Sequence, residues 1–125
     1  MSTELNKIKI LKASVGGFFE GNYNFEINLT THEVLWSHWL GGEEELMIKT
    51  ISAAEVKKFM RELQALRIME WKKKYSDPRI LDGTQWSLEI VTDGLTIKKS
   101  GSNQFPNEWD GFCKLIREIT ENEFS

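Results

Sequence analysis

The sequence predicts an α+β fold, an antiparallel sheet of about six to seven strands with two amphipathic helices on one face, in the order ββββ-α-βββ-α. Short segments of strand character, separated by turn residues, fill the chain up to residue 51 and again from 67 to 100. Apolar residues recur at helical spacing from Val56 and again from Trp109. Because strands joined by short turns pair antiparallel, we expect both helices to cover one side of a single sheet.

The first half of the chain is predicted to hold four strands. A glycine-rich turn at residues 16–21, a turn at Thr31-His32 and a break at Gly41-Gly42 separate them. In the first strand, Ile8 and Ile10 are expected on one face. The second alternates without a fault, with its odd positions inward. The predicted strands are residues 5–11, 23–29, 34–40 and 46–51.

The first helix is predicted to begin at Ser52. Ser52 and Glu55 have the spacing of a capping box, in which the serine side chain accepts from the Glu55 amide while the glutamate reaches back. One apolar stripe follows: Val56, Phe59, Met60, Leu63 and Leu66. Residues 67–85 are too many for a structureless loop, so a further strand is expected around Met69, Trp71 and Tyr75, with turns at 76–78 and 82–83.

Residues 86–92 and 95–100 flank Asp93-Gly94, a strong signal for a two-residue β-hairpin. The turn fixes the register. It places apolar partners on one face and opposite charges on the other, which favours pairing across the strands. A slip by one residue would expose an isoleucine. The expected pairs are Thr92–Leu95, Ile90–Ile97 and Leu88–Lys99 inside, with Val91–Thr96 and Glu89–Lys98 outside.

Residues 100–109, SGSNQFPNEW, are predicted to join the last strand to the last helix. Gly101 would supply positive φ, Asn103 a left-handed residue and Asn107 the N-cap. Alternatively, the amides of residues 101–103 could form a nest for an anion, although Glu108 and Asp110 would repel one. The helix stripe comprises Trp109, Phe112, Cys113, Ile116 and Ile119.

Size and charge narrow the classes of function. The 125 residues suit a single globular domain, residues 1–125, and a net charge of −3 argues against broad nucleic-acid binding. Apolar runs are short and no signal peptide is visible, so no membrane association and a cytoplasmic location are expected. Lysines 72–74, between Trp71 and Tyr75, are interpreted as a solvated strand that deters edge pairing.

The chain offers little for catalysis or metal binding. His32, His38 and Cys113 have no reason to converge on a metal, and no cofactor motif is present. Cys113 lies on an apolar helix stripe, where cysteine behaves as a small hydrophobe. The acidic run 43–45 is interpreted as a solvated loop tip that could attract a basic partner. We therefore expect a non-enzymatic protein, and an enzyme with His38 as base is an alternative without support.

The residues Trp36-Ser37-His38-Trp39 suggest an interaction surface, because the two tryptophans must face opposite sides of one strand. A two-residue turn at Thr31-His32 would pair Ile27 with Trp36 and Phe25 with His38, leaving Leu35 and Trp39 outward. A turn longer by one residue would instead place Trp36 and His38 outward. Tryptophan is enriched at binding hot spots. The candidate protein-binding residues are therefore Leu35, Trp36, His38 and Trp39.

DGTQWSLEI at 82–90, followed by SGSNQFPNEW, resembles a pattern in small uncharacterised bacterial proteins, in which a tryptophan-bearing hairpin precedes a Gly-Ser-Asn-aromatic-Pro joint and a terminal helix. The resemblance covers roughly residues 68–119. It implies a bacterial origin and supports the fold, but it carries no known activity.

Together these observations predict a small bacterial cytoplasmic protein that binds another protein through the sheet face opposite its helices, in an immunity-like or regulatory role. A homodimer is one form that such binding could take. The alternative is a small-ligand or anion-binding module at the sheet end formed by residues 82–86 and 100–109, with Gln85, Trp86, Ser102 and Asn103 as its ligand-binding residues.

Overall fold

A computed structural model, which describes residues 8–17, 21–76 and 83–124, confirms the predicted α+β fold and its order of elements. Four strands precede the first helix, and three strands precede the second. A short 3-10 helix, η2, follows the first helix. The elements are β1 Ile10–Gly17, β2 Gly21–Asn28, β3 Glu33–Leu40, β4 Glu43–Thr50, α1 Ala53–Ala65, η2 Ile68–Glu70, β5 Lys74–Ser76, β6 Gln85–Thr92, β7 Leu95–Ser102 and α2 Trp109–Thr120.

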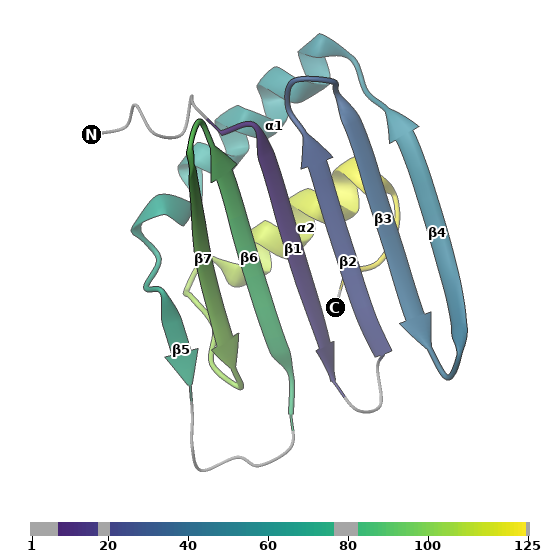
Figure 1. Cartoon of the computed structure of the whole chain (residues 1–125), viewed down its shortest axis with the longest axis vertical. Coiled ribbons are helices and arrows are strands. Elements are labelled where there is room, and N and C mark those ends of the chain that lie inside the picture. The colour runs from purple at the N-terminus through teal and green to yellow at the C-terminus, as the bar shows by residue number, and fades with distance from the viewer. Residues whose placement is uncertain (1–7, 18–20, 77–82, 125) are drawn as a thin grey trace.

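The seven strands form one sheet in the order β4-β3-β2-β1-β6-β7-β5 (Figure 1). All neighbours pair antiparallel except β5 and β7, which are parallel. Strand β1 is central, because it pairs with β2 on one side and β6 on the other. It therefore joins the four-stranded first half of the chain to the β6–β7 hairpin, and β4 and β5 are the two edges of the sheet.

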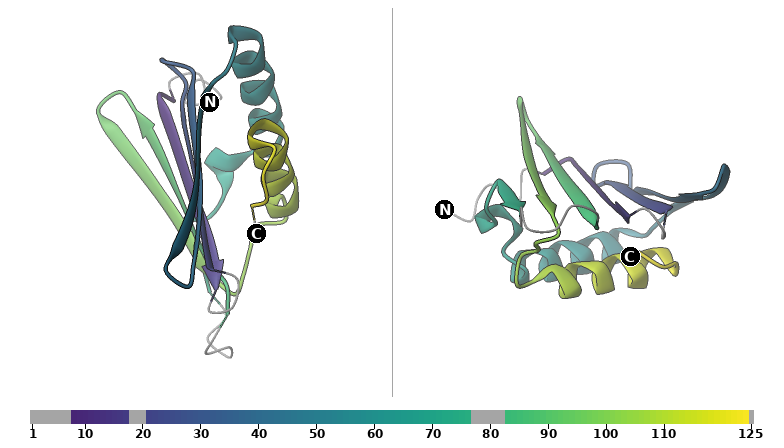
Figure 2. Two further views of the ribbon diagram at one scale, coloured as in Figure 1. Left: turned by 90° about the vertical axis from the view of Figure 1, so that its right-hand side faces the viewer. Right: turned by 90° about the horizontal axis from the view of Figure 1, so that it is seen from below.

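Both helices lie on the same side of the sheet (Figure 2), as predicted. The core lies between the two layers, where alternate residues of the central strands meet the apolar stripes of α1 and α2. Fully buried side chains come from both layers: Leu11, Phe25, Ile27, Leu88 and Ile90 from the sheet, and Phe59, Leu63, Phe112 and Ile116 from the helices. We call the other side of the sheet the open face.

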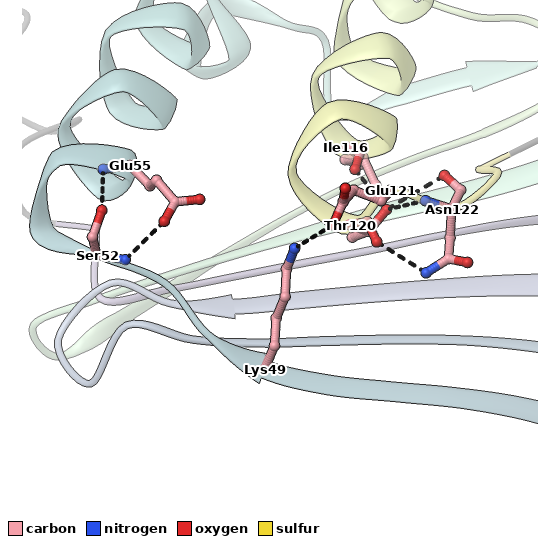
Figure 3. Close-up of polar contacts among 7 residues, drawn as sticks. All are labelled: Lys49, Ser52, Glu55, Ile116, Thr120, Glu121 and Asn122. Carbon is pink, nitrogen blue, oxygen red and sulfur yellow. Dashed lines mark hydrogen bonds and ion pairs between the residues drawn. The ribbon is translucent and has the colours of Figure 1, made fainter.

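Helix α1 begins with the predicted capping box (Figure 3). The Glu55 amide donates to Ser52 Oγ at 3.1 Å, and the Ser52 amide donates to Glu55 Oε1 at 3.1 Å. Hydrogen bonding to the backbone and then to the side chain of Ser52, together with nearby Lys49, lowers the pKa of the Glu55 carboxyl below 4.5. The first turn of the helix is thus stabilised by a carboxylate near its positive end.

The first strand begins later than predicted. Strand β1 covers residues 10–17, and its Leu11, Ala13 and Val15 are buried. Ile8 belongs to the core whereas Ile10 lies in the strand on the open face, so the expectation that they share a face was wrong. The alternation from Leu11 to Val15 is weak in sequence because its inward residues include a small alanine. Residues 5–7 of the predicted strand, and 18–20 of the predicted turn, lie outside the described residues.

Strand β4 is longer than predicted, and it corrects the interpretation of residues 43–45 as a loop tip. Gly41 and Gly42 adopt φ of 61° and 87°, so two residues complete the turn and Glu43 already pairs with Leu40. The three glutamates are exposed but lie within the strand. The chain therefore presents an eight-residue strand at this edge of the sheet.

The second half follows the prediction closely at the hairpin. All five expected pairs of β6 and β7 are present, including Leu88 opposite Lys99. Lys99 is buried, and its Nζ donates to the carbonyl oxygens of Met69 at 2.9 Å and Trp71 at 2.6 Å. Burial, and then the charge of Lys73, lower the pKa of the Lys99 ammonium below 10.5.

The expected strand around Met69, Trp71 and Tyr75 is reduced to β5, because Met69 lies in η2 and Trp71 follows it. Trp71 is drawn into the core, where its indole packs edge-on against Trp86 and Phe112. The predicted turns at 76–78 and 82–83 fall largely on residues 77–82, which lie outside the described part of the chain.

The joint between β7 and α2 was predicted in part. Asn103 has φ of 59°, as expected, but Gly101 does not have positive φ. A Cβ at Gly101 would lie 2.2 Å from Trp86 Nε1, so this glycine makes room for the indole. The N-cap of α2 is Glu108, without a side-chain hydrogen bond, rather than Asn107. The Trp109 amide instead donates to the Pro106 carbonyl at 3.1 Å.

Candidate functional site: the open face of the sheet

Neither helix covers the open face of the sheet. This face has a hollow along its middle. In Figure 2 the β6–β7 hairpin turns away from the plane of β1–β4, on the side opposite the helices. Alternation along each strand decides which side chains lie there. From β1 to β7 they include Lys12, Ser14, Asn24, Glu26, Leu35, Ser37, Trp39, Leu46, Ile48, Gln85, Ser87, Glu89, Lys98 and Ser100.

Two neighbouring cavities of about 650 and 480 Å³ lie over β1, β6 and β7. Both are lined by Ser14, Ser87 and Ser100, so they adjoin on the same face, and we call the two together the serine groove. Ser14 Oγ and Ser87 Oγ are 2.6 Å apart and share a hydrogen bond. The groove floor therefore offers hydroxyl groups that can both donate and accept.

Charged side chains along one half of the serine groove neutralise one another. Lys12 Nζ lies 3.9 Å from carboxylate oxygens of both Glu26 and Glu89, and Lys98 Nζ lies 3.8 Å from Glu89. These groups are partly exposed, so the pairs add little stability. They leave this half of the groove without a dominant sign of charge.

A second feature of the open face lies on β3 and β4. Trp39, Leu46 and Ile48 are 47%, 58% and 56% exposed, and half-buried Leu35 lies beside them. Leu35 pairs with Ile48, Ser37 with Leu46, and Trp39 with Glu44, so these apolar groups occupy neighbouring positions on one face. We call Leu35, Trp39, Leu46 and Ile48 the outer patch.

The polarity of β4 differs from that of the central strands. Its open face carries Leu46 and Ile48 together with Glu44, whereas its helix side carries Glu43, Glu45 and Lys49 together with Met47, which packs against the core. Lys49 reaches Glu121, just after α2, at 3.5 Å (Figure 3). A strand stabilised only by its own core would place the apolar side chains toward the helices. The outer patch therefore has no role in the core and suits contact with another molecule.

The structure divides the four predicted protein-binding residues between the two faces. Leu35 and Trp39 lie on the open face. Trp36 is buried on the helix side, where its Nε1 donates to the Glu123 carbonyl at 2.8 Å. His38 shares that side and stacks on Tyr23, with 4.1 Å between ring centroids. Trp39 is thus the outward tryptophan, and Trp36 and His38 are not part of the outer patch.

The pairing of β2 with β3 explains this division. Phe25 pairs with Trp36 and Ile27 with Val34, which differs by two residues from the expected register. The loop spans residues 29–32 rather than Thr31-His32 alone. Since a shift of two residues keeps every side chain on its face, the alternative with a two-residue turn names the observed outward residues, Leu35 and Trp39, although its register is wrong.

Three of the four predicted ligand-binding residues, Gln85, Trp86 and Ser102, line the larger cavity of the serine groove. Trp86 is 2% exposed, and its Nε1 donates to the Gln104 carbonyl at 2.9 Å, so its indole belongs mainly to the core. Asn103 is not among the lining residues. The alternative of an anion nest at residues 101–103 is not supported, because Gly101 and Ser102 lie within β7 and the Asn103 amide donates to the Thr84 carbonyl at 2.8 Å.

The groups considered for catalysis and metal binding lie apart. Cys113 is buried on the core side of α2, as expected for a small hydrophobe. His38 faces Glu45 across the strands, but its ring packs against Tyr23, away from the serine groove. Within residues 8–17, 21–76 and 83–124, no three His, Cys, Asp or Glu residues are grouped so as to hold a metal ion.

Leu46 and Ile48 are the site residues that sequence reasoning missed. Their alternation with Met47 and Lys49 was visible, but the sequence does not say which set faces the helices. Comparison with known protein families and with curated proteins found no match. In the part of the chain that the structure describes, no helix has the length and apolar character needed to cross a membrane.

Proposed function

We propose that this protein is a non-enzymatic protein-binding module whose partner contacts the open face of the sheet, with the outer patch as anchor. The exposure of Leu46 and Ile48 on the open face of β4 carries the proposal. Leu46 and Ile48 are more than half exposed, although the same strand turns charged residues toward the helix layer. A bacterial, cytoplasmic, immunity-like or regulatory setting belongs to the same proposal and rests on the sequence alone.

The outer patch has the composition of a binding hot spot. Complete burial of an exposed leucine or isoleucine contributes roughly 1.5–3 kcal/mol, and tryptophan is enriched among residues that dominate interface energies. Trp39 lies at one end of the patch and Ile48 near the other, so a partner covering both would also exclude water from Leu35 and Leu46. The adjacent serine groove would supply hydrogen bonds at the rim.

The charges around the outer patch indicate the partner's chemistry. Glu43, Glu44 and Glu45 are consecutive and exposed beside Trp39 and Leu40. Among the described residues none of the three takes part in an ion pair. Of the three, Glu44 lies on the open face opposite Trp39, whereas Glu43 and Glu45 lie on the helix side of the same edge strand. We therefore propose a partner surface that is apolar at its centre and basic at the side that meets Glu44.

Matched serine variants test the proposal. Leu46→Ser and Leu95→Ser remove the same side chain from positions that are both 58% exposed, but Leu95 lies at the β6–β7 turn, away from the outer patch. A photo-crosslinking residue at Trp39 or at Leu95 would capture neighbours in cells of the source organism, identified by mass spectrometry. We expect one protein to be captured from Trp39 and lost on Leu46→Ser. Equal capture from both positions would contradict the proposal.

The serine groove supports a second candidate function, binding of a small polar ligand. Its larger cavity, about 650 Å³, brings Gln85 and Ser102 together with Ser14 and Ser87. A ligand rich in hydroxyl or amide groups would match these side chains. Screening of small metabolites by NMR should then shift signals of Ser87 and Ser100, and Gln85→Ala should weaken binding. Shifts confined to β4 would favour the protein partner instead.

A further inference from the structure

We propose that β4 is also a self-association edge, and that a second copy of this chain pairs with it antiparallel across a two-fold axis at Met47. The two sheets then become one continuous sheet with the helices of both copies on the same side. The proposal goes beyond the function proposed above, because it uses the backbone edge of β4 rather than the open face, and because its partner is the chain itself.

The two edges of the sheet differ in how well they are protected against pairing. Strand β5 has three residues and follows Lys72 and Lys73, which makes it short and basic. Strand β4 has eight residues, pairs with β3 without a bulge and contains no proline. Short length, charged side chains, prolines and bulges are the usual means of blocking an edge, and of these β4 has only its charged side chains, whose opposite signs at Glu45 and Lys49 can pair with a copy. Among the described residues nothing lies beyond β4 in the sheet (Figure 1).

A continuous sheet restricts how β4 can meet its own copy. Residues directly opposite one another in an antiparallel pair lie on the same face. The two-fold axis must therefore pass midway between one residue of β4 and the same residue of the copy. With the axis at Met47, Leu46 lies opposite the partner's Ile48 on the open face, and the reciprocal pair repeats this contact. On the helix side, Glu45 lies opposite the partner's Lys49, again twice.

The neighbouring registers are less complementary. With the axis at Leu46, Glu45 faces the partner's Met47 and Glu44 faces the partner's Ile48, so carboxylates meet apolar side chains. With the axis at Ile48, Met47 faces the partner's Lys49 and Leu46 faces the partner's Thr50. The register centred on Leu46 also pairs Leu46 with its own copy and Glu43 with the partner's Lys49, but it places Glu44 and Glu45 against apolar side chains. The register centred on Met47 pairs apolar with apolar residues and opposite charges with each other without such a mismatch between residues 45 and 49, and these are the combinations that stabilise neighbouring strands.

This pairing would place the two outer patches side by side. Leu46 and Ile48 of both copies would form the centre of a surface twice as large, with a Trp39 at each side. The interface itself consists of one strand from each copy, which is at the small end of specific interfaces. We therefore expect a dimer whose population rises with protein concentration rather than a permanent one.

Charge reversal tests the contact between Glu45 and Lys49. Glu45→Lys places like charges opposite each other at two symmetric positions, and we expect dimerisation to weaken about tenfold or more by sedimentation. The double variant Glu45→Lys with Lys49→Glu should restore it, because the pair is re-formed in the opposite sense. Glu43→Lys is the matched control, because it makes the same change of charge on the same strand and the same face. In this register Glu43 lies opposite the partner's Ile51, which follows the end of β4, so no ion pair is affected.

Single cysteines test the register independently. Across the two-fold axis the Cα atoms of residue 47 would be about 4.5–5.5 Å apart, within the range of about 4.4–6.8 Å typical of disulfides. Met47→Cys should therefore form a disulfide-linked dimer under mild oxidation, faster than Leu46→Cys or Ile48→Cys. The wild-type chain is the control, since its Cys113 is buried.

A wild-type chain that stays monomeric at every concentration, or fastest cross-linking at position 46 or 48, would overturn the proposal. So would weakening by Glu43→Lys as large as that by Glu45→Lys. Circular dichroism of each variant identifies any that fail to fold, and because these substitutions are on exposed or edge positions we expect none to do so. All measurements use the purified chain alone, so they do not depend on whether a partner binds the open face.

Discussion

The two halves of the open face follow opposite rules. Under the serine groove, β6 turns Trp86, Leu88 and Ile90 toward the helices and leaves Gln85, Ser87 and Glu89 outside, as a strand with one buried face should. On β4, Leu46 and Ile48 lie outside, whereas the helix side carries Glu43, Glu45 and Lys49 around a single apolar residue, Met47. The burial of apolar side chains in the core therefore explains the arrangement of the groove half. It does not explain the outward apolar side chains of the outer patch.

The two halves should differ most in the loss of stability that follows when one leucine of each is replaced by alanine. Leu88→Ala, in the groove half, empties a site that is 1% exposed and should cost about 2–5 kcal/mol of the free energy of unfolding. Leu46→Ala, in the outer patch, should change it by no more than about 0.5 kcal/mol. Urea denaturation of both variants measures the difference. A large loss from Leu46→Ala would mean that the outer patch is structural.

Gly101 tests how tightly the groove half is packed. A Cβ there would lie 2.2 Å from Trp86 Nε1 and 2.6 Å from the Gln104 carbonyl, so Gly101→Ala should destabilise the chain by about 1–3 kcal/mol. Gly111→Ala, at an exposed position of α2, is the control. Its Cβ meets the movable end of Leu66, at 2.8 Å, and helix propensity favours alanine by about 1 kcal/mol. Thermal denaturation should therefore rank Gly101→Ala well below Gly111→Ala.

Strand β4 leads directly to the capping box of α1. Ser52→Ala should lower the free energy of unfolding by about 1 kcal/mol, because it removes the acceptor of the Glu55 amide. The lowered pKa of Glu55 adds a pH dependence of known sign. Its stabilisation is present above pH 4.5 and disappears as the pH falls through the lower pKa of the folded state. Ser52→Ala should therefore show a smaller loss of stability on acidification than the wild type. An identical acid dependence would show that the capping box does not hold the carboxylate.

The smallest expected effect comes from Lys99, on the helix side of the groove half. Because its pKa is lowered on folding, the unfolded chain binds more protons between that pKa and 10.5. The free energy of unfolding should then rise with pH across this window and stay constant below it. Lys99→Met should remove the rise, measured as the difference in slope between variant and wild type. If the free energy of unfolding of the wild type does not change with pH in this window, folding does not lower the pKa of Lys99.

Local patterns predicted those elements whose signals are contained in a few neighbouring residues. The capping box at Ser52, the Asp93-Gly94 hairpin and its five pairs each depend on contacts between residues close in sequence. The predicted start of β1 and the predicted N-cap of α2 were wrong. The backbone hydrogen bonds at these two points, from the Lys9 amide to Val91 and from the Trp109 amide to Pro106, depend on geometry that residue spacing does not encode. Gly101 was explained wrongly because its neighbour is Trp86, on another strand.

The candidate site was predicted less completely than the fold. Leu35 and Trp39 were identified from the strand period, but Trp36 and His38 were included because the turn length was undecided. Leu46 and Ile48 were missed because the sequence does not say which of the two alternating sets of β4 side chains faces the helices. Of the predicted ligand-binding residues, Gln85, Trp86 and Ser102 do line one cavity, since the hairpin register brings their strands together.

The α+β class, the order of strands and helices and the presence of an outward aromatic residue on β3 follow from the sequence alone, because periodicity and turn residues act over short distances. The central place of β1, the position of β4 at the edge of the sheet and the outward direction of Leu46 and Ile48 follow from the tertiary structure. These features depend on which strands meet and where the two helices end over the sheet, and both are settled by packing between residues far apart in the chain.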